Sequence, residues 1–254
     1  MTPYLNILGK SIPYYGILFA GGLVIGGLSA LFRAKKRNID RFDILCASVF
    51  AGIMGIIGAK LLSILTTMNY IIEYKIPFIE IIKNGFVFYG GLLGGTLGLL
   101  LYCKIFKLPF IDFADVFAVS VPLGHAVGRV GCFISGCCYG ITYSGFPSVV
   151  YTNTVDVNTP LETPLLAIQL IESAALLVLY LVLCLLFYKS PKKGLCTTVY
   201  VISYAVIRFV LEFFRGDIER GVFLGFSTSQ LISVCILIAM AYILLYRYLK
   251  KINS

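Results

Sequence analysis

Residues 164–188 read PLLAIQLIESAALLVLYLVLCLLFY, an apolar run in which Glu172 is the only charged side chain. A hydrocarbon layer about 30 Å thick is crossed by roughly 20 apolar residues of α-helix. Because lipid offers the backbone no hydrogen-bond partner, such a segment must satisfy its own N–H and C=O groups, as a helix does. This stretch therefore predicts a transmembrane helix.

Further apolar runs of similar length lie between charged or Pro- and Gly-containing breaks. Of the 254 residues, 59% are hydrophobic and 13% are charged, with a mean hydropathy of +0.93, which excludes a water-soluble globular protein. We predict an all-α integral membrane protein that forms a single polytopic domain over residues 1–254. About seven spans are expected, near residues 14–32, 44–67, 85–103, 113–135, 164–188, 195–214 and 228–246.

Two segments between these spans are too long to be simple turns. Residues 68–84 contain the amphipathic stretch IIEYKIPFIEIIK, which predicts an interfacial helix. Residues 136–163 are rich in Gly, Thr, Tyr and Pro, and predict an extracytoplasmic loop that forms a small arm or lid over the outer face.

The basic residues set the expected orientation. The formal charge is +9, but thirteen Lys and Arg residues follow the first, third, fifth and last spans, whereas five lie on the opposite side. Cytoplasmic loops carry the excess of Lys and Arg, so we expect the N-terminus outside and the C-terminus in the cytoplasm. Insertion and anionic headgroups account for this charge, and no nucleic-acid partner is expected. The thirteen are Arg33, Lys35, Lys36, Arg37, Arg41, Lys104, Lys107, Lys189, Lys192, Lys193, Arg247, Lys250 and Lys251, and the five are Lys10, Lys75, Lys83, Arg215 and Arg220.

Ionisable residues inside the spans carry the functional information, because each costs roughly 2.5–3.5 kcal/mol or more at the bilayer centre unless it is paired or hydrated. They could simply pair, Lys60 with Glu172 and Arg208 with Glu212, which leaves Arg129 without a carboxylate. With His125 neutral, three cations then face two anions. One bound anion would balance the excess, and a phospholipid phosphodiester is the anion available at that depth. The planar fork of Arg suits phosphate. The six residues are Lys60, His125, Arg129, Glu172, Arg208 and Glu212.

Residues 122–140, PLGHAVGRVGCFISGCCYG, surround Arg129. Helical spacing places Gly124, Gly128 and Gly131 on a small-residue face that another helix can approach closely. His125, Arg129 and Cys132, at i, i+4 and i+7, project together from a neighbouring face.

At these residues the chain resembles the phosphatidylglycerol:prolipoprotein diacylglyceryl transferases, integral membrane enzymes of bacteria. The resemblance covers nearly the whole chain, and two of its blocks are specific: the glycine-flanked Arg129 in its polar-ended span, and RFVLEFFRGD over residues 208–217. The other matching blocks are PYYGILFAGG, GIIGAKLL with Lys60 where Arg is usual, FYGGLLGG from Phe88, AIQLIES around Gln169, and STSQLIS around Gln230.

The resemblance implies a reaction and roles for residues. The diacylglyceryl group of phosphatidylglycerol would pass to the lipobox cysteine thiol of a prolipoprotein, in the bacterial cytoplasmic membrane, with prolipoprotein signal peptides and membrane lipids as partners. No cofactor and no metal are expected. Arg129 would bind the lipid headgroup, and Arg208 and Glu212 would line the same cavity as catalytic residues. The supporting positions would be Tyr15, Gln169 and Glu172.

Four departures from the family pattern fall in the site itself. Tyr89 stands where many members have His, and Cys132, Ser135 and Cys137 replace two Asn residues and a Glu. Tyr89, with an unperturbed pKa near 10, is a poorer base at neutral pH than His. His125, the single histidine, could take the base's role instead, or could be a hydrogen-bonded packing residue.

Other functions remain open at this point. Cys132, Cys137, Cys138 and His125 have the residue types of a soft-metal site or a thiol relay, although their spacing is not a CxxC pair, and small residues packing near the outer surface would explain the cysteines equally. A carrier or channel could also use Arg129 and Arg208 as an anion site, but the chain lacks an evident internal repeat.

Overall fold

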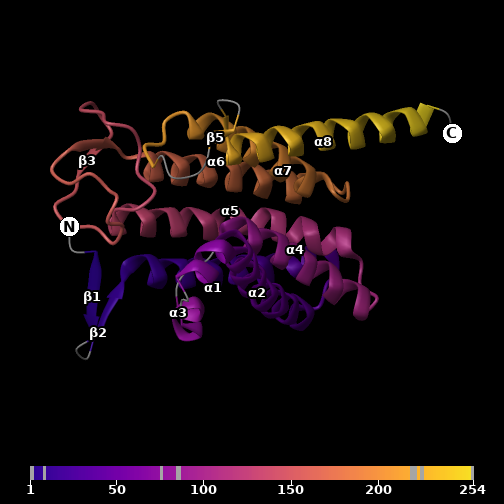
Figure 1. Ribbon diagram of the computed structural model, residues 1–254. Helices are drawn as coiled ribbons and strands as arrows, with labels where there is room; N and C mark the ends of the chain where they lie inside the picture. Colours follow the sequence, from indigo (N-terminus) through magenta and orange to yellow (C-terminus); the bar gives the residue numbers. More distant parts are fainter. Residues whose placement is uncertain are drawn as a thin grey trace. The chain divides into compact units, whose positions relative to one another are not determined.

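A computed structural model describes residues 3–7, 10–74, 77–83, 87–217, 222–223 and 226–252 (Figure 1). The chain divides into two compact units, residues 1–29 with 117–254, called here the site unit, and residues 30–116, called the second unit. Each unit is described by itself.

Among the described residues, seven apolar helices occupy the predicted spans. Six of them are long and apolar enough to cross a membrane, and α4 is a shorter apolar helix, so the expected all-α membrane fold is confirmed. The bounds are α1 Tyr14–Ala34, α2 Arg41–Glu73, α4 Phe88–Ile105, α5 Phe110–Ser135, α6 Ile168–Lys189, α7 Leu195–Glu212 and α8 Thr228–Ile252, with short helices α3 Phe78–Lys83 and η1 Lys35–Arg37.

The second unit is built on α2 and α4, which pack through glycine. The backbone carbonyl of Gly58 lies where a side chain on Gly90 would begin, and Gly94 meets the carbonyl of Met54 in the same way. The absence of side chains lets the two backbones touch. In the same unit Arg37 forms an ion pair with buried Asp115 at 3.1 Å. Helix α2 continues to Glu73, so the predicted interfacial segment 68–84 begins inside this helix and continues into α3.

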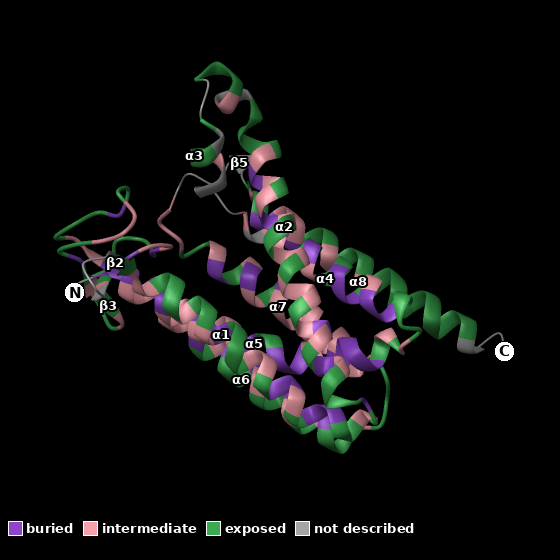
Figure 2. Ribbon diagram, turned by 90° about the horizontal axis from the view of Figure 1, so that it is seen from below, coloured by how far each residue is buried: buried purple, intermediate pink, exposed green. Residues whose placement is uncertain are grey.

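In the site unit, α1 lies against α5 at the small-residue face predicted from residues 124–131. Gly22 and Gly124 face each other, each with its carbonyl where a side chain on the other would stand. Gly131 faces Leu18, whereas no described atom lies within 4 Å of a side chain built on Gly128. The prediction is therefore right for two of the three glycines. Of the six spans, α5 is the most buried: 56% of the residues in its most apolar 18-residue stretch are buried, compared with 17% in α1 (Figure 2).

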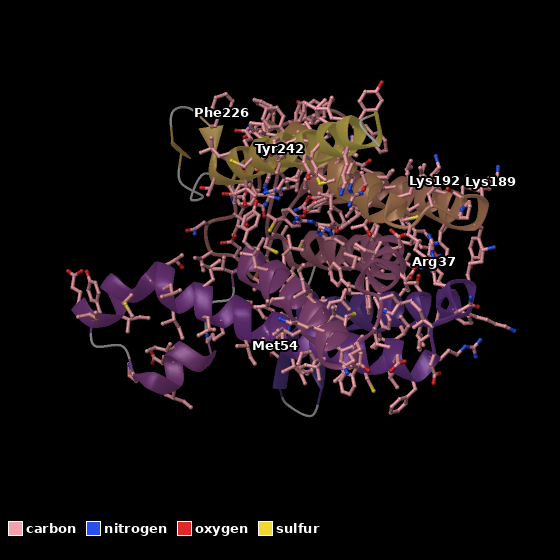
Figure 3. The ribbon with its side chains drawn as sticks, turned by 90° about the vertical axis from the view of Figure 1, so that its right-hand side faces the viewer. Arg37, Met54, Lys189, Lys192, Phe226 and Tyr242 are labelled. Carbon is pink, nitrogen blue, oxygen red and sulfur yellow. The ribbon has the colours of Figure 1, made fainter. Side chains whose placement is uncertain are left out.

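Helices α6, α7 and α8 lie side by side in the same unit (Figure 1). Ser173 on α6 donates a hydrogen bond to the Ala126 carbonyl on α5 at 3.0 Å. Ser227 and Gln230 form a reciprocal cap at the start of α8: the Gln230 N–H donates to Ser227 Oγ, and the Ser227 N–H donates to Gln230 Oε1. This capping box fixes the first turn of α8. At the C-terminal end of α6, Lys189 and Lys192 lie close together in Figure 3.

The segment 136–163 is more ordered than the loop expected from its composition. Strand β3 Ser148–Val150 pairs antiparallel with β4 Pro164–Leu166, and Tyr139, Tyr151 and Leu165 form a small apolar core. The Tyr151 hydroxyl donates to the Phe133 carbonyl at 2.9 Å, which ties this arm to the end of α5. Two further antiparallel hairpins are β1 Tyr4–Ile7 with β2 Lys10–Pro13, and β5 Val222–Phe223 with β6 Phe226–Ser227.

The contact between Gly22 and Gly124 leads to a stability prediction. We expect Gly22→Ala to lower the unfolding temperature in detergent, because overpacking costs about 1–3 kcal/mol. Gly21→Ala is the matched control, since no described atom lies within 4 Å of the added carbon and Ala is the better helix former. Equal unfolding temperatures for the two variants would contradict the α1–α5 contact.

Candidate functional site: a buried arginine–carboxylate cluster

Helices α5 and α6 bring three predicted site residues together. Arg129 Nη2 lies 2.9 Å from Glu172 Oε1, and His125 Nε2 lies 3.9 Å from the same oxygen. The Glu172 side chain is 1% exposed. His125 and Arg129 thus share one helical face, as their spacing predicted. The expectation that Arg129 lacks a carboxylate is wrong, because α6 turns Glu172 toward α5.

Helix α7 contributes the second ion pair. Arg208 Nη2 lies 2.6 Å from Glu212 Oε2, one helical turn away, and donates a hydrogen bond to Ser229 Oγ at 3.1 Å. The pairing of Arg208 with Glu212 considered from the sequence is therefore confirmed. Since Ser229 lies inside the capped first turn of α8, the cap described above also positions the partner of Arg208.

The two ion pairs belong to one cluster. His125 interacts electrostatically with Arg129, Glu172 and Arg208, and Glu172 interacts with Arg129 and Arg208. The two guanidinium groups thus act on the same carboxylate. Two arginines against two glutamates leave this cluster neutral, so the excess positive charge inferred from the sequence is not found here. It came from counting Lys60, which lies on α2 in the second unit.

The guanidinium groups nevertheless keep donors to spare. Arg129 Nε, Arg208 Nη1 and Arg215 Nη1 are buried and have no hydrogen-bond partner among the described residues. Leaving a buried donor unsatisfied costs about 1–3 kcal/mol, and more for a charged group. Three cationic donors with unused hydrogen-bonding capacity are suited to an anion with several acceptor oxygens.

Arg215 is a site residue that the sequence reasoning missed, since it was counted with the outward-facing basic residues. Its side chain is 3% exposed and forms a bidentate pair with Asp217, at 2.9 and 2.7 Å. A backbone bridge between Gly140 and Arg215 holds it beside the arm. Hydrogen bonding to Asp217 raises the pKa of Arg215 against the opposing effect of burial, so it stays charged. The Arg-Gly-Asp spacing at the end of α7 was the available signal.

An aromatic face of α7 also went unnoticed in the sequence. Tyr200, Tyr204 and Arg208 follow one another at intervals of four residues. The Tyr204 ring meets the His125 ring edge-on, with centroids 5.4 Å apart, and stacks on Tyr200. This face closes one side of the cluster with aromatic rings.

The supporting positions are brought to the same region. The Tyr15 phenol interacts electrostatically with Arg129, and its backbone N–H donates to Ser135 Oγ at 2.9 Å. Gln169 Nε2 donates to the Cys137 carbonyl at 2.8 Å, and so holds the start of the arm. Tyr89, the departure expected at the base's position, lies on α4 in the second unit.

Three cysteines meet where α5 ends. Gly136, with φ +70°, terminates the helix; its N–H donates to the Phe133 carbonyl, and the Cys137 N–H donates to the Cys132 carbonyl at 3.1 Å. This pair of bonds is the Schellman motif, which turns the chain back over the last helical turn. Cys138 also has a left-handed backbone, with φ +58°. As a result the Sγ atoms of Cys132, Cys137 and Cys138 all lie within 4.8 Å of one another.

The surroundings of Cys138 favour its thiolate. Hydrogen bonds with the Cys132 and Cys137 thiols lower the pKa of Cys138, and Arg215 and Arg129 act in the same direction against the effect of burial. Negative charge on the Cys138 sulfur is therefore compatible with the neighbouring guanidinium groups, whereas hydrogen bonds with the other two thiols raise the pKa of Cys137.

Apolar helices that enclose paired arginines and glutamates define a polytopic membrane protein with a charged internal site. The chain belongs to the prolipoprotein diacylglyceryl transferase family, whose model matches residues 3–246. The resemblance drawn from the sequence is thereby confirmed.

Three relatives illustrate the similarity. The chain is 33% identical over 233 residues to phosphatidylglycerol–prolipoprotein diacylglyceryl transferase 2 of Clostridium perfringens, covering 92% of this chain and 90% of the relative. The transferase of Clostridium tetani is 35% identical over 238 residues, with 92% and 93% covered. That of Finegoldia magna is 32% identical over 250 residues, with 97% and 95% covered.

The ion pair of Glu172 can be tested directly. Glu172→Gln leaves Arg129 buried without its counterion, and breaking a buried pair from one side costs about 3–5 kcal/mol. We expect a clear drop in the unfolding temperature. Glu80→Gln, at an exposed position of α3, serves as the control and should leave it unchanged. An unchanged unfolding temperature for Glu172→Gln would show that the pair does not stabilise the helices.

Proposed function

We propose that the charged cluster binds the phosphate of phosphatidylglycerol while the diacylglyceryl group is transferred to the cysteine thiol of a prolipoprotein. Membership of the family and the names of the relatives support this reaction. The observation that carries the site assignment is the set of buried, unpartnered donors on Arg129, Arg208 and Arg215. The same membership favours a transferase over the anion carrier considered from the sequence.

The chemistry needs both a nucleophile and a stabilised leaving group. The acceptor thiol loses its proton, and the thiolate attacks the carbon of the diacylglycerol moiety that is bonded to the phosphate oxygen. A C–S bond forms, the C–O bond to phosphate breaks, and glycerol phosphate leaves with the bonding electrons. Negative charge grows on the leaving phosphate, where fixed guanidinium donors in a water-poor site are most effective.

We assign a different part to the arginines and the glutamates of the two ion pairs. Arg129 and Arg208 offer donors to the lipid phosphate, while Glu172 and Glu212 hold the guanidinium groups in place. Tyr15 and Gln169 support the end of α5. The acceptor would be the cysteine thiol at the signal peptide of a precursor anchored in the bacterial cytoplasmic membrane. Both substrates would reach the charged cluster through the surrounding lipid.

Arg129 is the first residue to test. We expect Arg129→Lys, which keeps the charge but removes the fork, to lower transfer from phosphatidylglycerol to a lipobox peptide by about 100-fold or more, the loss typical of one removed oxyanion donor. Arg41→Ala, at an exposed position of α2, should stay near the parent rate. Parent-like transfer by Arg129→Lys, in protein that inserts normally, would remove the phosphate role.

His125 is proposed as the base that receives the thiol proton, because it faces Glu172 and is the single histidine. A general base contributes at least about 100-fold, so His125→Gln should cost that much in kcat and should remove one limb of the pH–rate profile. Tyr89→Phe is measured beside it. A mild loss of kcat in His125→Gln with an unchanged pH–rate profile would show that His125 is a packing residue. A large loss of kcat in Tyr89→Phe would identify Tyr89 as the base.

A further inference from the structure

Beyond the ion pairs, the least expected group in the molecule is the set of three thiols at the end of α5, called here the thiol cluster: Cys132, Cys137 and Cys138. Small packing residues have no reason to converge at their sulfur atoms. Here the three Sγ atoms lie within 4.8 Å of one another.

The backbone explains how adjacent cysteines can face one point. In an extended chain, neighbouring side chains point to opposite faces. The Schellman turn instead returns Cys137 beside Cys132, and the left-handed conformation at Cys138 turns its side chain to the same place. A left-handed backbone at a non-glycine residue costs free energy and is commonly found at functional sites. The Gln169 side chain further fixes the loop through the Cys137 carbonyl.

We propose that the thiol cluster binds one thiophilic metal ion of the zinc class through three sulfur atoms. An ion with Zn–S bonds of about 2.3 Å and tetrahedral angles needs sulfur atoms roughly 3.8 Å apart, and the three Sγ atoms already lie within 4.8 Å of one another. Soft sulfur donors select zinc-class and cuprous ions over magnesium and calcium. Cys137 and Cys138 are half-buried, so an ion can reach them, and Cys132 is buried behind them.

The neighbouring charges suit this ion. Three thiolates around one divalent cation carry a net charge of −1. Arg129 and Arg215 both interact electrostatically with Cys138, and this attraction favours negative charge on its sulfur, while Glu172 and Asp217 also pair with the two guanidinium groups. The metal site would therefore lie next to the proposed phosphate donors and fix the first residues of the arm to α5.

Three protein ligands leave one position of a tetrahedral ion open, as in catalytic rather than structural zinc sites. A thiol is a preferred ligand for that position. Resting on the proposed transfer function, the acceptor cysteine would bind there as thiolate, its proton passing to His125. A metal-bound thiol is deprotonated at neutral pH, so the ion would activate the acceptor for attack.

The first experiment measures metal binding by the reduced full-length protein in detergent. Cadmium is titrated as a probe, with sulfur-to-metal absorption as the signal, and zinc is then added as competitor. We expect one ion per chain, displaced by zinc and not by magnesium. The triple variant Cys132→Ser, Cys137→Ser, Cys138→Ser should lose it. The matched control Cys46→Ser, Cys184→Ser, Cys235→Ser, with substitutions on α2, α6 and α8, should retain it.

A second readout covers the case in which the triple variant folds poorly. In the parent protein, cadmium should protect these three cysteines, and not Cys235, from alkylation measured by mass spectrometry. Absence of a stoichiometric ion, equal binding by both triple variants, or a disulfide within the cluster that survives mild reductant would each overturn the metal site.

The acceptor role has its own test. A lipobox peptide with Cys should increase the sulfur-to-cadmium absorption of the loaded protein, and the same peptide with Ser should not. An identical spectrum with both peptides would overturn the ligand role. Full transfer by metal-free protein would overturn the metal's role in the reaction while the proposed function stands; loaded protein that binds the Cys peptide but transfers nothing would overturn the proposed function instead.

Discussion

The cost of a charge in apolar surroundings governs the arrangement of the site unit. An ionised side chain inside a membrane helix persists only when it is paired or hydrated, and Arg129 meets this requirement through Glu172 on a different helix. The pair fixes how α5 and α6 face each other, and His125 follows because it shares the same side of α5. Arg208 forms its ion pair within its own helix, and the aromatic face of the same helix meets His125.

Pairing and ligand binding are compatible here because a guanidinium group has more donors than one carboxylate can accept. Glu172 and Glu212 each engage one side of an arginine fork, and the Nε of Arg129 and the Nη1 of Arg208 remain for a ligand. The carboxylates lower the cost of burying the cations before a lipid arrives. A neutral cluster with unused donors can accept and release an anionic headgroup more readily than isolated buried cations could.

The sequence predicted the spans well because length and hydropathy act locally, and helical spacing correctly placed His125 and Arg129 on one face. The partner of Arg129 could not be predicted, because it depends on how α6 rotates against α5. Pairing by composition assigned Glu172 to Lys60, whereas Glu172 pairs with Arg129 on α5. Arg215 was missed because its burial comes from a backbone bridge to Gly140, a tertiary contact. The convergence of the cysteines depends on a left-handed turn that a helical-wheel argument does not contain.

The bridge between Gly140 and Arg215 and the bond from Arg208 to Ser229 also constrain the order of biosynthesis. Because the helices are synthesised in sequence, the ion pair between Arg129 on α5 and Glu172 on α6 can form early. The hydrogen bond from Arg208 to Ser229 forms only after α8 has been synthesised. The backbone bonds that join Tyr139 and Ile141 to residues 214–216 likewise form only after those residues have been synthesised. The nascent protein therefore carries a partly built cluster through most of its insertion, and the contacts of Arg208 are completed only in the last stage of assembly.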